Sequence, residues 1–151
     1  MILVIGWGSP VRGDDALGQY LAMRLAALRP DWQVITTCQL TPELTLPICD
    51  ADLVVFIDAR MDGETGAITC ETITADETGS AFTHYLTPAS LLALAHLLYG
   101  VQPAALLITV GGLSFGLGDD LSPVLRAALP RITERVEEMI ALSALEIPPK
   151  D

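Results

Sequence analysis

The sequence contains very little positive charge. Its single lysine is Lys150, and lysine and arginine together number 8 against 19 acidic residues, for a formal net charge of −11. A nucleic-acid-binding protein needs a dense cationic surface to displace the counterions of the phosphate backbone. An anionic membrane surface would repel this chain as well. We therefore expect no nucleic-acid partner, and any electrostatic partner to be neutral or basic.

Long hydrophobic runs are also missing. The longest apolar stretch, Leu91–Tyr99, contains His96 and is far shorter than the roughly 20 residues of a membrane-spanning helix. Met1–Gly6 is apolar from its first residue, without the basic segment that opens a secretory signal. The only cysteines, Cys38, Cys49 and Cys70, lack the close pairing of a zinc or redox motif. We expect a cytoplasmic protein without membrane insertion, with its cysteines as buried, reduced thiols.

Apolar runs of strand length alternate along the chain with segments of helical periodicity. This alternation predicts a single three-layer α/β domain, with a mainly parallel, five-stranded twisted sheet and helices on both faces. A length of 151 residues suits one core. We assign residues 1–146 to this domain and residues 147–151, which contain Pro148 and Pro149, to a flexible tail. The predicted strands are Ile2–Ile5, Gln33–Cys38, Leu53–Ile57, Ala105–Val110 and, at an edge of the sheet, Ala67–Ile73.

Helix starts carry recognisable capping signals. Thr41-Pro42, Thr87-Pro88 and Ser122-Pro123 each combine a capping hydroxyl with proline at the first helical position. Asp14 or Asp15 is expected to cap the first helix. Pro130 should kink or interrupt the last helix, because proline removes a backbone donor.

Glycines after the first buried strand raise the possibility of a phosphate cradle in the loop Gly6–Asp15. The loop lacks the P-loop lysine, and Asp14 and Asp15 stand at the helix start, where a phosphate would need backbone amides. Two carboxylates there would repel a third anion. A nucleotide- or phosphate-binding domain is therefore the least favoured of the functions we consider.

Two acids and a histidine follow predicted strands or precede a helix. Asp58 comes directly after the apolar run Leu53–Ile57, where an unpaired carboxylate is costly to desolvate; its structural partner would be Arg12 or Arg60. Asp15 and His84 lie in loops that can reach the same edge of the sheet, where such folds bind ligands. Two carboxylates and an imidazole suit a borderline divalent metal such as nickel or zinc.

The motifs in this order resemble the nickel–iron hydrogenase maturation proteases. The resemblance is carried by Gly6-x-Gly8-x-Pro10-x-Arg12-Gly13-Asp14-Asp15-x-x-Gly18, Gln39-Leu40-Thr41-Pro42-Glu43-Leu44, Asp58, His84 with Leu86-x-Pro88, Gly111-Gly112, and Gly118 with Leu121-Ser122-Pro123. It spans most of the chain. Ser9 and Ala16 depart from the usual asparagine and glycine of the family, and Asp15 replaces the glutamate of some members.

The resemblance implies an endopeptidase that removes the C-terminal extension of a hydrogenase large subunit after nickel insertion. By motif position, Asp15, Asp58 and His84 would contact the nickel and serve catalysis. The nickel would be supplied by the substrate, so the free enzyme would need none of its own. Either a metal-polarised carbonyl or a carboxylate-activated water would then serve hydrolysis. The alternative is a non-catalytic chaperone that recognises the metal-loaded subunit with the same residues.

Overall fold

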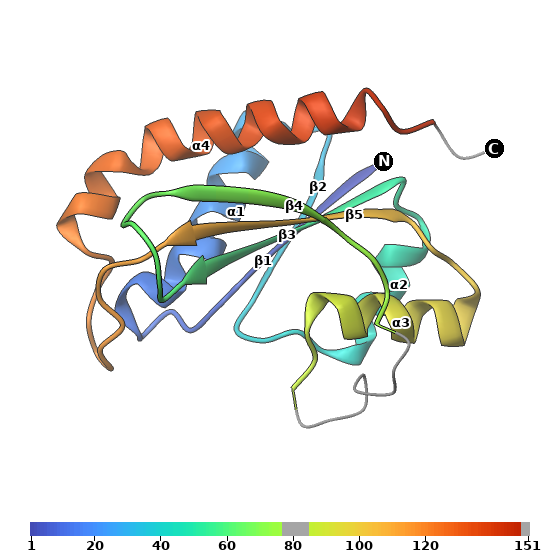
Figure 1. The fold of residues 1–151 in the computed structure, drawn as a ribbon, viewed down its shortest axis with the longest axis horizontal. Helices are drawn as coiled ribbons and strands as arrows, with labels where there is room; N and C mark the ends of the chain where they lie inside the picture. The colour runs from blue at the N-terminus through green and yellow to red at the C-terminus, as the bar shows by residue number, and fades with distance from the viewer. Residues whose placement is uncertain (77–84, 149–151) are drawn as a thin grey trace.

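The structure is a computed structural model that describes residues 1–76 and 85–148. Its sheet consists of β1 (Ile2–Trp7), β2 (Gln33–Thr37), β3 (Leu53–Arg60), β4 (Ile68–Ile73) and β5 (Ala104–Gly111). Its α-helices are α1 (Leu17–Leu28), α2 (Thr45–Cys49), α3 (Pro88–Tyr99) and α4 (Pro123–Ala144). Short 3₁₀ turns, Gly13–Ala16 and Pro42–Leu44, lead into α1 and α2. The predicted α/β domain is confirmed (Figure 1).

The strands lie in the order β2-β1-β3-β5-β4. The first four are parallel, and β4 joins the edge antiparallel to β5. From β1 the chain proceeds to β2 on one side and then to β3 on the other side, so the strand order reverses between β1 and β3. The predicted neighbourhood of the first and third strands is confirmed, and so is the edge position of β4.

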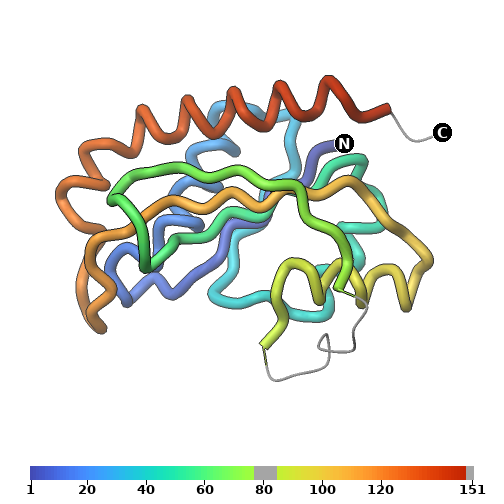
Figure 2. The backbone as a smooth tube through the Cα atoms, in the orientation of Figure 1, coloured from blue at the N-terminus to red at the C-terminus, as the bar shows by residue number. Residues whose placement is uncertain are grey.

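Helices cover both faces of the sheet because the central strands are apolar on both faces. One core lies between the sheet and the pair α1 and α4, and includes Val55 and Ile57 of β3. The other core lies between the sheet and the pair α2 and α3, and includes Val54 and Phe56 of the same strand. Figures 1 and 2 show α4 along one side of the strands and α3 on the opposite side.

The ends of α3 follow local sequence signals closely. The Thr87 side chain accepts a hydrogen bond from the Ser90 amide, and the Ser90 hydroxyl accepts one from the Thr87 amide, which completes a capping box. Gly100 ends the helix in the left-handed conformation. By contrast, α4 continues through Pro130 without the interruption we considered. Its apolar stripe, which includes Leu129 and Ile132, is buried against the sheet on both sides of the proline.

The expectation that the three cysteines are buried is wrong: Cys49 is only partly buried, and the other two are exposed. Cys38 and Cys70 are exposed rather than buried, because Cys38 follows the edge strand β2 and Cys70 lies on the edge strand β4. In the described part of the chain, no helix is long and apolar enough to cross a membrane. The division into a domain of residues 1–146 and a flexible tail stays a prediction.

Candidate active site

Asp14 is fully buried and holds the first loop against the segment before α4. Its carboxylate accepts hydrogen bonds from the amides of Leu113 (2.8 Å), Ser114 (3.0 Å) and Ser122 (2.7 Å), and from the Ser122 hydroxyl (2.8 Å). Burial opposes ionisation of Asp14, but these bonds outweigh it and hold the pKa below the ordinary 3.8. The prediction that Asp14 or Asp15 caps the first helix is wrong, since no side-chain cap is present at α1.

Asp15, the next residue, has a different environment. It is partly exposed, and its Oδ2 accepts a hydrogen bond from the Ser9 amide at 2.7 Å. Gly8 allows this loop to close: its φ is +145°, and a Cβ added there would lie 1.9 Å from the Asp15 carbonyl oxygen. The glycine therefore allows the backbone of the loop to lie directly against Asp15.

Asp58 lies in β3, two residues before the strand ends, and is largely buried. Among the described residues, its carboxylate accepts one hydrogen bond, from the Ala59 amide at 2.9 Å. Burial raises the pKa of Asp58 to about 7; the Ala59 bond opposes this rise, and the nearby charge of Asp15 adds to it. The two carboxylates are thus electrostatically coupled, although they come from different elements.

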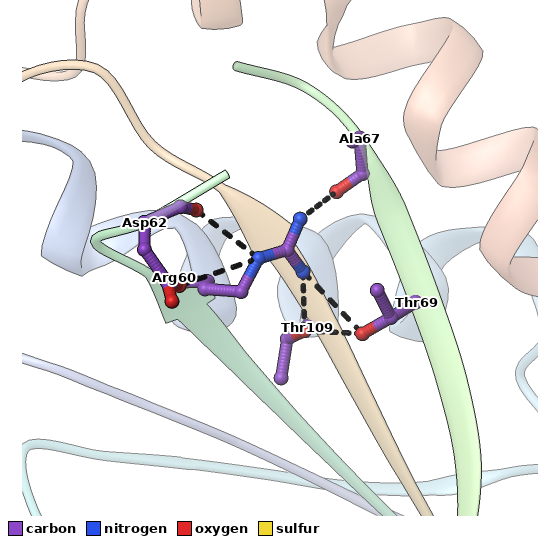
Figure 3. A network of polar contacts seen from close by, with 5 residues as sticks. All are labelled: Arg60, Asp62, Ala67, Thr69 and Thr109. Atoms are coloured by element: carbon purple, nitrogen blue, oxygen red, sulfur yellow. Dashed lines mark hydrogen bonds and ion pairs between the residues drawn. The ribbon is translucent and has the colours of Figure 1, made fainter. Parts of the chain in front are cut away.

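Arg60 does not neutralise Asp58. Its guanidinium group donates to the carbonyl oxygens of Asp62 and Ala67 and to the hydroxyls of Thr109 (2.6 Å) and Thr69 (3.4 Å) (Figure 3). Within residues 1–76 and 85–148, no arginine or lysine lies within ion-pair distance of Asp15 or Asp58. The structural ion pair that we considered for Asp58 is therefore not formed with Arg60 or with Arg12.

Asp15 and Asp58 line one cleft of about 800 Å³. The cleft opens beside the carboxyl ends of β1 and β3, which is where open α/β sheets bind ligands. Its other walls, which the sequence did not predict, come from the segment after β2 and from α3. The lining residues are Trp7, Gly8, Asp15, Cys38, Gln39, Leu40, Thr41, Pro42, Asp58, Tyr85, Leu86, Leu94 and Leu98.

His84, the third predicted ligand, lies outside the described residues. The described residues by themselves contain no group of three histidine, cysteine, aspartate or glutamate side chains arranged to hold a metal. Tyr85 and Leu86, which follow His84 in the sequence, line the same cleft as the two aspartates. The structure thus brings together two of the three predicted site residues.

The fold and the cleft define an α/β protein with an acidic site at the reversal point of a mainly parallel sheet. Comparison with solved structures then shows the family. The [NiFe] hydrogenase maturation protease HycI from Thermococcus kodakarensis KOD1 is 31% identical, over 93% of this chain and 92% of its own, with a TM-score of 0.67. The chain belongs to the [NiFe] hydrogenase maturation protease family.

More distant structures share the fold. The hydrogenase maturating endopeptidase HybD from E. coli is 22% identical over 97% of this chain and 94% of its own, with a TM-score of 0.71. An endopeptidase from Escherichia coli is 23% identical over 98% and 96%, with a TM-score of 0.72. Comparisons with models of protein families and with curated proteins find no match. Membership of a family of endopeptidases makes this chain a peptide-bond hydrolase.

Proposed function

We propose that this endopeptidase removes the C-terminal extension of a nickel–iron hydrogenase large subunit and recognises the nickel already bound there. The observation that carries the proposal is the pair Asp15 and Asp58, which share one open cleft without a cationic side chain among the described residues to neutralise them. Such a pair is costly to maintain unless a cation from elsewhere completes it. The large-subunit precursor is the partner we propose.

The side chains suit a borderline divalent metal. Carboxylate oxygens from Asp15 and Asp58, with an imidazole nitrogen from His84, form a mixed set that such a metal accepts. The nickel belongs to the substrate, so these residues would occupy its open coordination positions and anchor the large subunit. Its recognition would then place the adjacent peptide bond in the cleft for hydrolysis.

Protonation of Asp58 links metal recognition to pH. With a pKa of about 7, this carboxyl group carries its proton in an appreciable fraction of molecules at neutral pH. A carboxylate must lose its proton to bind a metal, so docking of the nickel-loaded subunit would release it. Water attack then requires either a carbonyl polarised by the metal or a carboxylate that accepts a proton from the water.

The test is to incubate the purified protein with nickel-loaded precursor large subunit and follow the mass of the precursor. The wild type should release the C-terminal peptide, whereas Asp15→Asn and His84→Ala should not. Asp120→Asn is the matched control, because Asp120 is exposed and does not line the cleft; it should cleave normally. Complete cleavage by both site variants would reject the site. Binding of the precursor without any change of mass would support the non-catalytic chaperone.

We also propose that processing takes place in the cytoplasm. Cys38 and Cys70 are exposed thiols outside any disulfide, and exposed thiols persist most readily in a reducing compartment. Cell fractionation with an antibody against the protein would test this location, and recovery outside the cytoplasm would contradict it.

A further inference from the structure

The cleft is larger than two carboxylates and a metal ion require. Its volume is about 800 Å³, and apart from the two aspartates most of the side chains that line it are apolar. Two of them, Leu94 and Leu98, come from α3, and we call this pair the leucine wall. A cleft with an acidic part and an apolar part can recognise a ligand that has two corresponding parts.

The geometry of α3 explains why the leucine wall faces the cleft. Residues four positions apart lie on one side of a helix, so Leu94 and Leu98 stand one above the other. The neighbouring side of the helix carries Leu91, Leu92 and Ala95, which are buried against the sheet. The helix is thereby held in place by one apolar side while it presents a second one to the cleft.

Leu98 has an unusual combination of properties. Its side chain is 55% exposed, and it nevertheless lines the same cleft as Asp15 and Asp58. Leu97 is also exposed, at 66%, but it does not line the cleft. Exposed leucines are common on protein surfaces, so the position of Leu98 inside the cleft, rather than its exposure, distinguishes it from its neighbour.

We propose that the leucine wall binds an apolar side chain of the large subunit in the segment that contains the cleaved bond, and so contributes to substrate specificity. This inference rests on the proposed function. The occupant is a peptide segment continuous with the nickel-bearing part of the precursor, because the leucine wall and the two aspartates line the same cleft.

Physical chemistry favours an apolar side chain at this position and disfavours an acidic one. Covering exposed leucine surface contributes about 25 cal/mol for each Å² removed from water. A charged side chain would lose hydration against the leucines without gaining a partner. An acidic side chain would in addition be repelled by the Asp15 carboxylate of the same cleft.

The experiment compares Leu98→Gln with Leu97→Gln, two adjacent exposed positions of one helix. For nickel-loaded precursor, Leu98→Gln should raise KM about tenfold, the effect of a modest apolar contact, with little change in kcat. Leu97→Gln should leave both constants unchanged. Equal thermal unfolding midpoints for the two variants would show that the change in KM does not reflect misfolding.

A pair of compensating substitutions, one in the enzyme and one in the precursor, identifies the precursor side chain that contacts the leucine wall. Apolar residues flanking the cleaved bond are replaced one at a time by aspartate, and each precursor is offered to the wild type and to Leu98→Lys. At the position that contacts the leucine wall, Leu98→Lys should cleave the aspartate precursor faster than the wild type does.

An unchanged KM in Leu98→Gln would overturn this inference, and so would a failure of Leu98→Lys to cleave any aspartate precursor faster than the wild type does. In both cases cleavage of native precursor by the wild type would still uphold the proposed function. Failure of the wild type to cleave native precursor would overturn the proposed function itself.

Discussion

Asp58 and Arg60 occupy alternate positions of β3, which place side chains on the same face of a strand, and no ion pair joins them. The Arg60 guanidinium instead donates hydrogen bonds to the hydroxyls of Thr69 and Thr109 and to two carbonyl oxygens, and it pairs with the exposed Asp62 carboxylate at 3.7 Å (Figure 3). Asp58 therefore remains without a counter-charge among the described residues. Because Arg60 bonds to these other groups, the carboxyl group of Asp58 lines the cleft without an ion-pair partner among the described residues.

The first prediction concerns the pH dependence of stability. Burial raises the pKa of folded Asp58 from 3.8 to about 7. The stabilising effect of its protonated form is complete below pH 3.8 and is lost as pH rises through about 7, because unfolding releases the proton over this interval. Asp58→Asn removes this dependence. At pH 8 the variant should be more stable than the wild type, by at most about 4 kcal/mol at 1.36 kcal/mol for each pH unit.

Urea denaturation at pH 4, 6 and 8 measures this difference between Asp58→Asn and the wild type. The advantage of the variant should grow with pH across the series. Asp120→Asn, at an exposed position, should show no such growth. A difference between Asp58→Asn and the wild type that stays constant from pH 4 to pH 8 would contradict the assignment of the raised pKa.

The second prediction concerns the Arg60 contacts. Arg60→Met removes the donors that connect β3 with β4 and β5, and should lower the free energy of unfolding by about 1–3 kcal/mol. Arg60→Lys should recover little of this loss, because an ammonium group cannot reproduce the planar array of donors. Both are measured by urea denaturation. The control is Arg135→Met, since Arg135 is 60% exposed and its ion pair with Glu138 is a surface pair. Equal losses in Arg60→Met and Arg135→Met would refute the structural role.

The third prediction separates two consecutive aspartates. Asp14→Ala leaves three backbone amides and one hydroxyl without their acceptor and should cost about 3 kcal/mol or more. Asp15→Ala loses one hydrogen bond within the described residues, from the Ser9 amide, and should cost much less. Guanidinium denaturation at pH 7 compares the two, and a similar loss in both would be inconsistent with the buried role of Asp14.

Acidification provides a second measurement on Asp14. Its folded pKa lies below the ordinary 3.8, so the contribution of its carboxylate to stability is complete above that value and is lost as pH falls below it. The stability gap between Asp14→Ala and the wild type should therefore narrow below about pH 4. A gap that widens on acidification would show that Asp14 has the opposite shift.

The fourth prediction concerns the contact between α1 and the sheet. A Cβ at Gly18 would lie 2.5 Å from the Ile57 carbonyl oxygen and 2.6 Å from that of Trp7. Gly18→Ala should therefore destabilise the protein by about 2 kcal/mol, although alanine is the better helix former by about 1 kcal/mol. Ala27→Gly, at an exposed position of the same helix, measures the propensity effect alone. An increase in thermal midpoint for Gly18→Ala would disprove the close contact.

The sequence predicts those elements whose conformation depends on residues close together in the chain. β1 and β3 are almost continuously apolar, which predicts strands covered on both faces, and the cap of α3 is formed by Thr87 and Ser90, three residues apart. The role of Asp14 could not be read in this way. Its hydrogen-bond partners lie about 100 positions further along the chain. An aspartate that caps a helix would have the same neighbours in sequence, so the sequence cannot distinguish the two roles.

The sequence by itself determined the alternation of strands and helices, the acid that follows the apolar run of the third strand, and the family motifs, because hydrophobic period, capping residues and motif order are local properties of a chain. The structure extends this strand through Arg60, so that Asp58 lies inside it. Only the tertiary structure decided which acid faces the cleft and which is buried, that Arg60 bonds to two threonines rather than to Asp58, and that leucines of α3 complete the cleft. These outcomes depend on strand order and on competition among distant hydrogen-bonding partners, and both are settled when the sheet assembles.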